Sequence, residues 1–402
     1  MPTLPHYQQF DGLHWETGCI RNALDYQGVK APHTGQPFSE ALLFGVSGGA
    51  VFGYFSFAYE GHDPHVALLT RNTFDPWDTL LARLGVVQEV YQTIKPDKAV
   101  KNLLDVLETG AVPIVWADFC SMPYNSLHML ADFWHMYPHI VYGYEPADHL
   151  VRLADRARVP LQITPEQLAA ARGRVKKADY RIVTLDLPDS AKLISAVQLG
   201  IWDCIKLYTE QPPKGAKHNF GFAAYQRWIE LLAKPKARLS WAREFPVGPK
   251  LYAGLTSTWR GIMVDGKEGQ AERHLFADFL DEASVILNKV LLKEVATQFR
   301  ASGKAWHELA NALLPERVPL FKQARELMWT RYQRFLNYGY DPAMMAATQA
   351  RLNAIKTELA ADFPLTDTEV AALHAEIAAH VRKIHDLELV GINTLRLAMG
   401  ER

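Results

Sequence analysis

The feature that most constrains the fold of this chain is a change in its hydrophobic pattern near residue 188. Before that point, strand-like runs such as AVPIVWADF (111–119) alternate with segments of helical period. Beyond it, nearly every apolar pattern repeats with the period of an α-helix. Because 402 residues also exceed the usual size of a single hydrophobic core, we expect two domains. We predict an α+β domain over 1–187 and a mainly α-helical domain over 188–402.

The same patterns locate the individual elements of both domains. In the first domain we predict four helices, over 17–27, 74–85, 97–109 and 164–172. We predict four strands in the same domain, over 111–119, 139–145, 150–155 and 180–187. In the second we predict helices over 189–208, 220–233, 270–299, 318–337, 342–361 and 366–399. The histidines of the last helix do not share one face, so we expect them to be exposed: His374, His380 and His385. The glycine-rich run at 45–55 lacks the Lys-Ser/Thr of a phosphate-binding loop and predicts a tight turn beside the first helix.

Charge and composition exclude several classes of function. The 43 basic and 44 acidic residues nearly cancel, so no global field attracts nucleic acid or an anionic membrane. No apolar run reaches the roughly 18–20 residues that span a bilayer, and the N-terminus lacks the pattern of a signal peptide. We therefore expect a cytoplasmic protein with reduced thiols, and neither a metal ion nor a cofactor. The cysteines are too few and too far apart for a disulfide framework or a zinc site: Cys19, Cys120 and Cys204.

Cys19 is the candidate nucleophile. It lies in LHWETGCIRNALDYQGV (13–29), near the start of the first predicted helix, which Gly28 closes. The first turn of a helix lowers the pKa of a thiol and so favours the reactive thiolate. A lone cysteine is also among the residues most often buried, so Cys19 as a small apolar core residue stays an open alternative.

His139 and Asp155 are the candidate base and its orienting carboxylate. They bound HIVYGYEPADHLVRLAD, which contains two strand patterns separated by a turn near residue 147. An antiparallel hairpin centred there pairs residues whose numbers sum to about 294, which places His139 opposite Asp155. A carboxylate beside an imidazole fixes its tautomer, as in a thiol triad. A shift of one residue would separate the two side chains, and an unrelated surface pair is the alternative.

Three further residues are candidates for binding. His14 precedes the first helix and could donate a hydrogen bond to an oxyanion, or it could only help to cap the turn. Asp118 and Tyr124 follow a predicted strand in VWADFCSMPY (115–124), where they could line a cleft.

Several segments together resemble one known family, butirosin biosynthesis protein H and its relatives. The matching segments span roughly residues 10–315: HWETGCIRNALDYQGV, FSEALLFGVSGGAVFGYF, VWADFCSMPY, HIVYGYE, HNFGFAAYQRWIELL, RHLFADFLDEA and WHELANALLP. The resemblance implies a papain-like N-terminal domain followed by a helical domain. It also implies an acyltransferase, which moves an aminoacyl group from a carrier-protein thioester to an amine of an antibiotic.

This chain departs from the family pattern at the nucleophile. In the family the cysteine directly follows the histidine, where this chain has Trp15 after His14. Cys19 lies one helical turn later, on the same face as Trp15. Two interpretations stay open, a relocated thiol or a chain that has lost its nucleophile.

The sequence therefore predicts an acyltransferase-like enzyme of small-molecule biosynthesis. Cys19 would accept an acyl group from a thioester, His139 would act as base and then acid, and Asp155 would orient it. If water resolves the acyl-enzyme, the same site is a thiol amidase or peptidase. A non-catalytic relative that binds a small molecule or a partner is the third alternative, because of Trp15. We expect a small-molecule acceptor and an acyl carrier protein as partners, while a homo-oligomer is left open.

Overall fold

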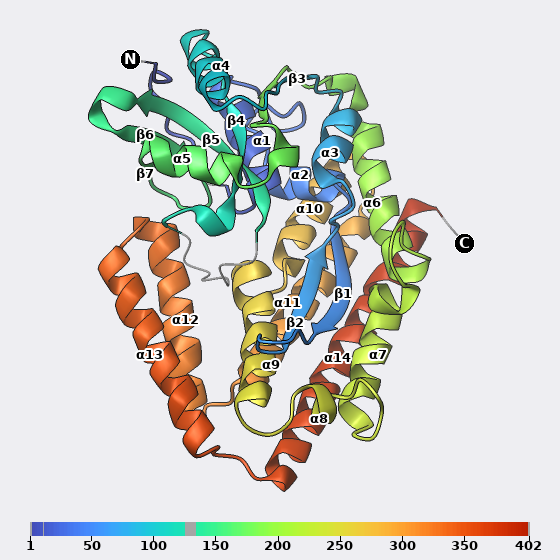
Figure 1. The fold of residues 1–402 in the computed structure, drawn as a ribbon. Coiled ribbons are helices and arrows are strands. Elements are labelled where there is room, and N and C mark those ends of the chain that lie inside the picture. The colour runs from blue at the N-terminus through green and yellow to red at the C-terminus, as the bar shows by residue number, and fades with distance from the viewer. Residues whose placement is uncertain (1, 11, 125–133, 401–402) are drawn as a thin grey trace. The chain divides into compact units, whose positions relative to one another are not determined.

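The computed structural model describes residues 2–10, 12–124 and 134–400, which form two compact units (Figure 1). The first unit comprises Met1–Leu43, Trp77–Leu193 and Arg331–Met345. The second comprises Phe44–Pro76, Ile194–Thr330 and Ala346–Arg402. Each unit therefore consists of three separate segments of the chain. The single domain boundary at 187/188 stays a prediction.

A six-stranded sheet forms the centre of the first unit, and every pair of neighbouring strands in it is antiparallel. Its order is β3-β8-β4-β5-β6-β7, with bounds β3 Gln88–Tyr91, β4 Ile114–Asp118, β5 Met136–Glu145, β6 Leu150–Ala154, β7 Leu161–Ile163 and β8 Ile182–Leu185. The helices of this unit are α1 Trp15–Tyr26, α3 Pro76–Leu84, α4 Pro96–Glu108 and α5 Pro165–Gly173. Both α1 and α5 pack on the sheet.

The second unit is built of helices around a two-stranded sheet (Figure 1). The strands are β1 Ala50–Phe57 and β2 His65–Arg71, and the short α2 Glu40–Val46 precedes them. The helices are α6 Leu193–Thr209, α7 Gly221–Ala233, α8 Trp241–Glu244, α9 Pro249–Arg260, α10 Arg273–Ile286, α11 Leu291–Leu313 and α14 Asp367–Met399. Two further helices, α12 Pro319–Tyr338 and α13 Pro342–Ala361, belong only in part to this unit, because Arg331–Met345 is assigned to the first. Because β1 packs on α7 and β2 on α9, the segment 44–76 belongs to this unit.

The predicted helices and strands are each present, with ends that differ by a few residues. The predicted helix over 270–299 is two helices, α10 and α11, because residues 287–290 interrupt it. The chain is a mixture of helices and sheet with a helical second half, as predicted, whereas a papain-like connectivity stays a prediction. None of the helices in the described part of the chain is long and apolar enough to cross a membrane.

The glycine-rich run forms a tight turn, as predicted. Gly48 and Gly49 have φ values of +119° and +66°, so they form the turn between α2 and β1 that the glycines favour. A Cβ on Gly49 would lie 2.5 Å from Cε2 of Phe276, which belongs to α10. The turn therefore packs against α10.

His374 of α14 is buried, contrary to the exposure predicted for it, with 6% of its surface accessible. Its ring meets Trp241 edge-on at a centroid distance of 5.8 Å. Burial lowers the pKa of His374 to about 4 because the charged ring loses water.

This pKa predicts a loss of stability in mild acid. The unfolded chain binds a proton at a pKa near 6.5, so stability falls as the pH drops from about 6.5 towards 4, by roughly 3 kcal/mol at most. Replacing His374 with Gln should flatten this part of the curve of unfolding free energy against pH in urea titrations. The same change at the exposed His218 should not, and an unaltered slope in His374→Gln would contradict the prediction.

Candidate active site

A buried carboxylate anchors the start of α1. Glu40 accepts hydrogen bonds from the backbone N–H groups of Leu13 at 2.6 Å and His14 at 2.9 Å, and from the Thr17 hydroxyl at 2.8 Å. Burial raises the pKa of Glu40, but the hydrogen bonds and charge of His14 outweigh it and the net shift is downward. Glu40 is thus a carboxylate at the positive end of the helix, where it does the work of a cap.

His14 belongs to this anchor. Its Nδ1 lies 3.1 Å from the Glu40 Oε1, and because that carboxylate only accepts, Nδ1 must be the donor. The structure therefore favours the capping alternative for His14.

Cys19 lies in an environment that opposes thiolate formation. The unpaired N–H groups of a helix belong to its first turn. Because α1 starts at Trp15, Cys19 lies beyond that turn. Its side chain is buried, and Sγ donates to the Pro138 carbonyl oxygen at 3.4 Å. Burial first, then the negative charges of Asp155, Glu16 and Glu40, raise the pKa of Cys19 well above its usual value. No hydrogen bond joins Cys19 to His139 in the described part of the chain.

We expect Cys19 to be slow to alkylate. At neutral pH, iodoacetamide should modify it at least about tenfold more slowly than the partly exposed Cys120, because a buried thiol reacts only when the structure opens. Peptide mass spectrometry reads out each site, and guanidinium should abolish the difference. Burial raises the pKa of Cys120 to about 11, so this control is itself not an activated thiol. Faster native labelling of Cys19 would contradict the structure.

Trp15 directly follows His14 and begins α1. Its indole stacks on Tyr137 at a centroid distance of 4.2 Å and meets the ring of Phe119 edge-on at 5.2 Å. The guanidinium carbon of Arg156 lies 4.1 Å from the centre of the same indole, a cation–π distance. Trp15 is therefore a packed structural residue, and it positions Arg156.

The predicted hairpin register is confirmed. Ile140 pairs with Ala154 and Val141 with Leu153, both sums being 294, and the register shifts by one only nearer the turn. Continuing the register brings His139 and Asp155 opposite each other. Their Nε2 and Oδ2 atoms lie 3.6 Å apart, and both side chains are buried.

The ionisation of this pair follows from its contacts. Burial lowers the pKa of His139 despite the nearby Asp155, so the imidazole is neutral at neutral pH. Nδ1 of His139 lies 2.9 Å from the carbonyl oxygen of Tyr137 and must be the protonated nitrogen. Burial raises the pKa of Asp155, but the charges of Arg156 and His139 outweigh it and the carboxylate is ionised. Two acceptors, His139 Nε2 and Asp155 Oδ2, therefore face each other.

Four buried polar atoms at this place make no hydrogen bond of ordinary geometry within the described residues, although the Tyr124 hydroxyl lies near the Asp155 carboxylate and interacts with it: His139 Nε2, Asp155 Oδ2, Tyr124 Oη and Arg156 Nη2. The ring of Tyr124 stacks on Phe335 at 6.0 Å. Burial and the charge of Asp155 raise the pKa of Tyr124, so its hydroxyl stays protonated. Unpaired buried polar groups cost about 1–3 kcal/mol each, and a cluster of four indicates a place built for a polar guest.

Asp118 is a turn residue in this structure. Its Oδ1 accepts from the backbone N–H groups of Cys120 at 3.2 Å and His135 at 2.8 Å, and Oδ2 accepts from Ser121 Oγ at 2.6 Å. It therefore caps the short 3₁₀ helix Phe119–Ser121, and both of its oxygens are occupied. Of the predicted residues, the structure brings together His139, Asp155 and Tyr124, and it places Asp118 and His14 in local anchors.

Sequence reasoning missed Arg156. It directly follows Asp155, and its backbone N–H and Nε donate to Asp155 Oδ1 at 2.7 and 3.3 Å. An arginine after a strand is usually exposed, so only the adjacent aspartate could have drawn attention to it.

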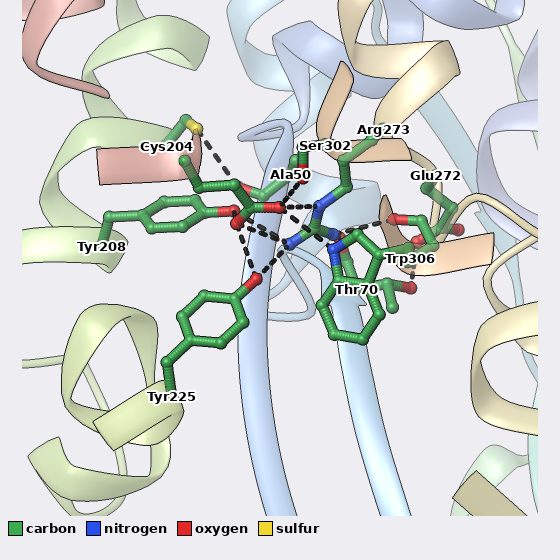
Figure 2. A network of polar contacts seen from close by, with 11 residues as sticks. Ala50, Thr70, Cys204, Tyr208, Tyr225, Glu272, Arg273, Ser302 and Trp306 are labelled. Carbon is green, nitrogen blue, oxygen red and sulfur yellow. Dashed lines mark hydrogen bonds and ion pairs between the residues drawn. The ribbon is translucent and has the colours of Figure 1, made fainter. Parts of the chain in front are cut away.

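A second polar network lies inside the helical unit (Figure 2). Arg273 of α10 and Glu388 of α14 are both fully buried, and Arg273 Nε donates to Glu388 Oε1 at 2.7 Å. Glu388 also accepts from four neutral side chains, Tyr208, Tyr225, Ser302 and Trp306. Arg273 Nη1 donates to the carbonyl oxygens of Thr70 and Ala271 at 2.8 Å each. Because the charged groups of Arg273 and Glu388 are hydrogen-bonded to each other and to these partners, the network connects α10 and α14 and has a structural role.

Comparison with known families gives two matches, one after the other along the chain. Residues 14–156 match the family model described as butirosin biosynthesis protein H, N-terminal, and residues 166–318 match a domain of unknown function (DUF4872). No curated protein matches the chain.

Proposed function

Because this chain belongs to the butirosin biosynthesis protein H family, we propose that it is an acyltransferase of antibiotic-type small-molecule biosynthesis. It moves an acyl or aminoacyl group from a thioester, held by an acyl carrier protein, to an amine of a small acceptor. The family name supports the biosynthetic role, and the geometry around His139 supports the chemistry.

The observation that carries the proposal is the pair of unpartnered acceptors, His139 Nε2 and Asp155 Oδ2, 3.6 Å apart and buried. A neutral amine has N–H groups for both atoms, so it would satisfy the two acceptors at once. His139 would then be in hydrogen-bond reach of the proton that it must remove. Because the pair is buried, binding of an acceptor requires residues around it to move.

The transfer is direct in this scheme. The amine nitrogen attacks the thioester carbonyl carbon while His139 Nε2 takes a proton from that nitrogen. The tetrahedral intermediate collapses, the carbon–sulfur bond breaks, and the leaving thiolate takes the proton from the imidazolium. Asp155 stabilises that imidazolium. No acyl group passes through Cys19, because its environment keeps the thiol protonated.

The test uses acetyl-N-acetylcysteamine as thioester and glucosamine as amine. We expect amide product from the wild type, no acetyl adduct on Cys19 by intact-protein and peptide mass spectrometry, and turnover in Cys19→Ala within about threefold of wild type. An acetylated Cys19, or loss of turnover in Cys19→Ala with an unchanged melting temperature, would establish the acyl-enzyme route instead. Acetate in place of amide would indicate the hydrolase.

A non-catalytic binding protein is the second candidate, and the packing of Trp15 favours it. An indole held by Tyr137 and Arg156 stands where the family expects a reactive thiol. In that case glucosamine or the thioester would bind, as calorimetry would show, and neither His139→Ala nor the wild type would form amide above the uncatalysed rate.

A further inference from the structure

We infer that Arg156 binds the carbonyl oxygen of the acyl donor and stabilises the oxyanion that forms on it. The inference rests on the acyl transfer proposed above and adds a catalytic residue to it. The residue was not a candidate in the sequence, and its contacts assign it this role.

One N–H donor of Arg156, Nη2, is buried without a hydrogen-bond partner among the described residues. Nε and Nη2 share one edge of a guanidinium, and here Nε donates to Asp155 Oδ1 at 3.3 Å. That edge therefore faces Asp155, whose other oxygen lies 3.6 Å from His139. Nη2 and Asp155 Oδ2 are both buried and both without a hydrogen-bond partner in the described part of the chain. The ion pair is thus held through one oxygen, and an unused donor remains on the edge of Arg156 that faces Asp155.

Three aromatic rings hold Arg156 in place. Its guanidinium carbon lies 4.1 Å from the ring centre of Trp15, 5.4 Å from that of Phe119 and 5.3 Å from that of Phe335. The residue is only 3% exposed. A fixed, desolvated cation needs no reorganisation when negative charge develops nearby, which is the condition for strong transition-state stabilisation.

In the proposed reaction the two neighbours of Asp155 have different roles: His139 transfers the proton and Arg156 stabilises the oxyanion. His139 Nε2 receives the proton of the attacking amine. As the nitrogen–carbon bond forms, the carbonyl π electrons move to oxygen, and Arg156 Nη2–H donates to that oxygen. When the carbon–sulfur bond breaks, the electrons return to the carbonyl and the thiolate leaves with the proton from His139. Arg156 keeps its own proton throughout.

The experiment separates carbonyl binding from turnover. The probe is the ketone analogue of acetyl-N-acetylcysteamine in which a methylene replaces the sulfur, so that the carbonyl is present but cannot be cleaved. Calorimetry should show binding to the wild type and a loss of roughly tenfold or more in Arg156→Lys, which lacks the planar fork. Arg172→Lys is the matched control, because Arg172 is equally buried and donates to the Tyr180 carbonyl oxygen. Melting temperatures report whether each variant is folded.

Kinetics distinguish a catalytic role from a positioning one. Arg156→Lys should lower kcat by about 10²–10³, raise KM for the thioester by about the factor by which ketone binding falls, and leave the pH midpoint of His139 unchanged. If Arg156 only positions Asp155, that midpoint moves and ketone affinity is unchanged, which overturns the inference. Failure of the wild type to bind the ketone also overturns it. If the ketone binds in an Arg156-dependent way but no amide forms, the carbonyl-binding role of Arg156 is supported and the proposed acyl transfer is rejected.

Discussion

Replacing Glu388 with alanine is expected to lower the free energy of unfolding by roughly 3–5 kcal/mol, because it leaves the buried Arg273 cation without a counter-charge. Burial raises the pKa of Glu388, but Arg273 outweighs it, so the side chain is ionised and accepts from the guanidinium through both oxygens. The hydroxyl groups of Tyr208 and Tyr225, at 2.6 and 2.7 Å, would lose the same acceptor.

Urea unfolding followed by circular dichroism measures this effect. The control is Glu308→Gln, which removes an exposed ion pair between Glu308 of α11 and Lys383 of α14, the helix that also carries Glu388, and should cost less than about 1 kcal/mol. The double variant Arg273→Met, Glu388→Leu should recover only part of the loss, because the tyrosine hydroxyls stay unpaired. A Glu388→Ala protein as stable as the control would show that the network contributes nothing.

Replacing His139 with alanine is expected to lower kcat for amide formation by about 10²–10⁴, the usual contribution of a general base. The physical reason is that Nε2 is the only neutral base beside Asp155 in the described part of the chain, with its tautomer set by the Tyr137 carbonyl oxygen. Exposed His149, on the same hairpin, is the control, and His149→Ala should stay within about twofold of wild type. Equal rates for both variants would reject His139 as the base.

The pH dependence of the reaction tests the same residue. Burial lowers the pKa of His139, so the neutral, active form persists below the ordinary value of 6.5. We expect kcat/KM to be constant near neutral pH and to fall as acid protonates the ring, with a midpoint below 6.5. A midpoint above 6.5 would mean that the ion pair with Asp155 controls the pKa instead.

Local patterns predicted much of the fold because they report local physics. Helices α5 and α14 begin with capping boxes at Thr164 and Thr366, and Gly28 closes α1 with a φ of +75°. The strands β1 and β2 were missed, since their positions depend on helices far along the chain, such as α7 and α9. The burial of His374 was missed for the same reason, because its ring packs against Trp241.

The sequence by itself determined the composition of the two halves, the family, and the pairing of His139 with Asp155, since hairpin register follows from alternation and turn position between neighbours in sequence. Only the tertiary structure decided that Cys19 is buried where the pKa of its thiol is raised, that Trp15 packs on Arg156, and that Arg273 meets Glu388 115 positions away. Burial and charge around a side chain are set by residues from many parts of the chain, and these quantities determine whether a thiol, an imidazole or a guanidinium can react.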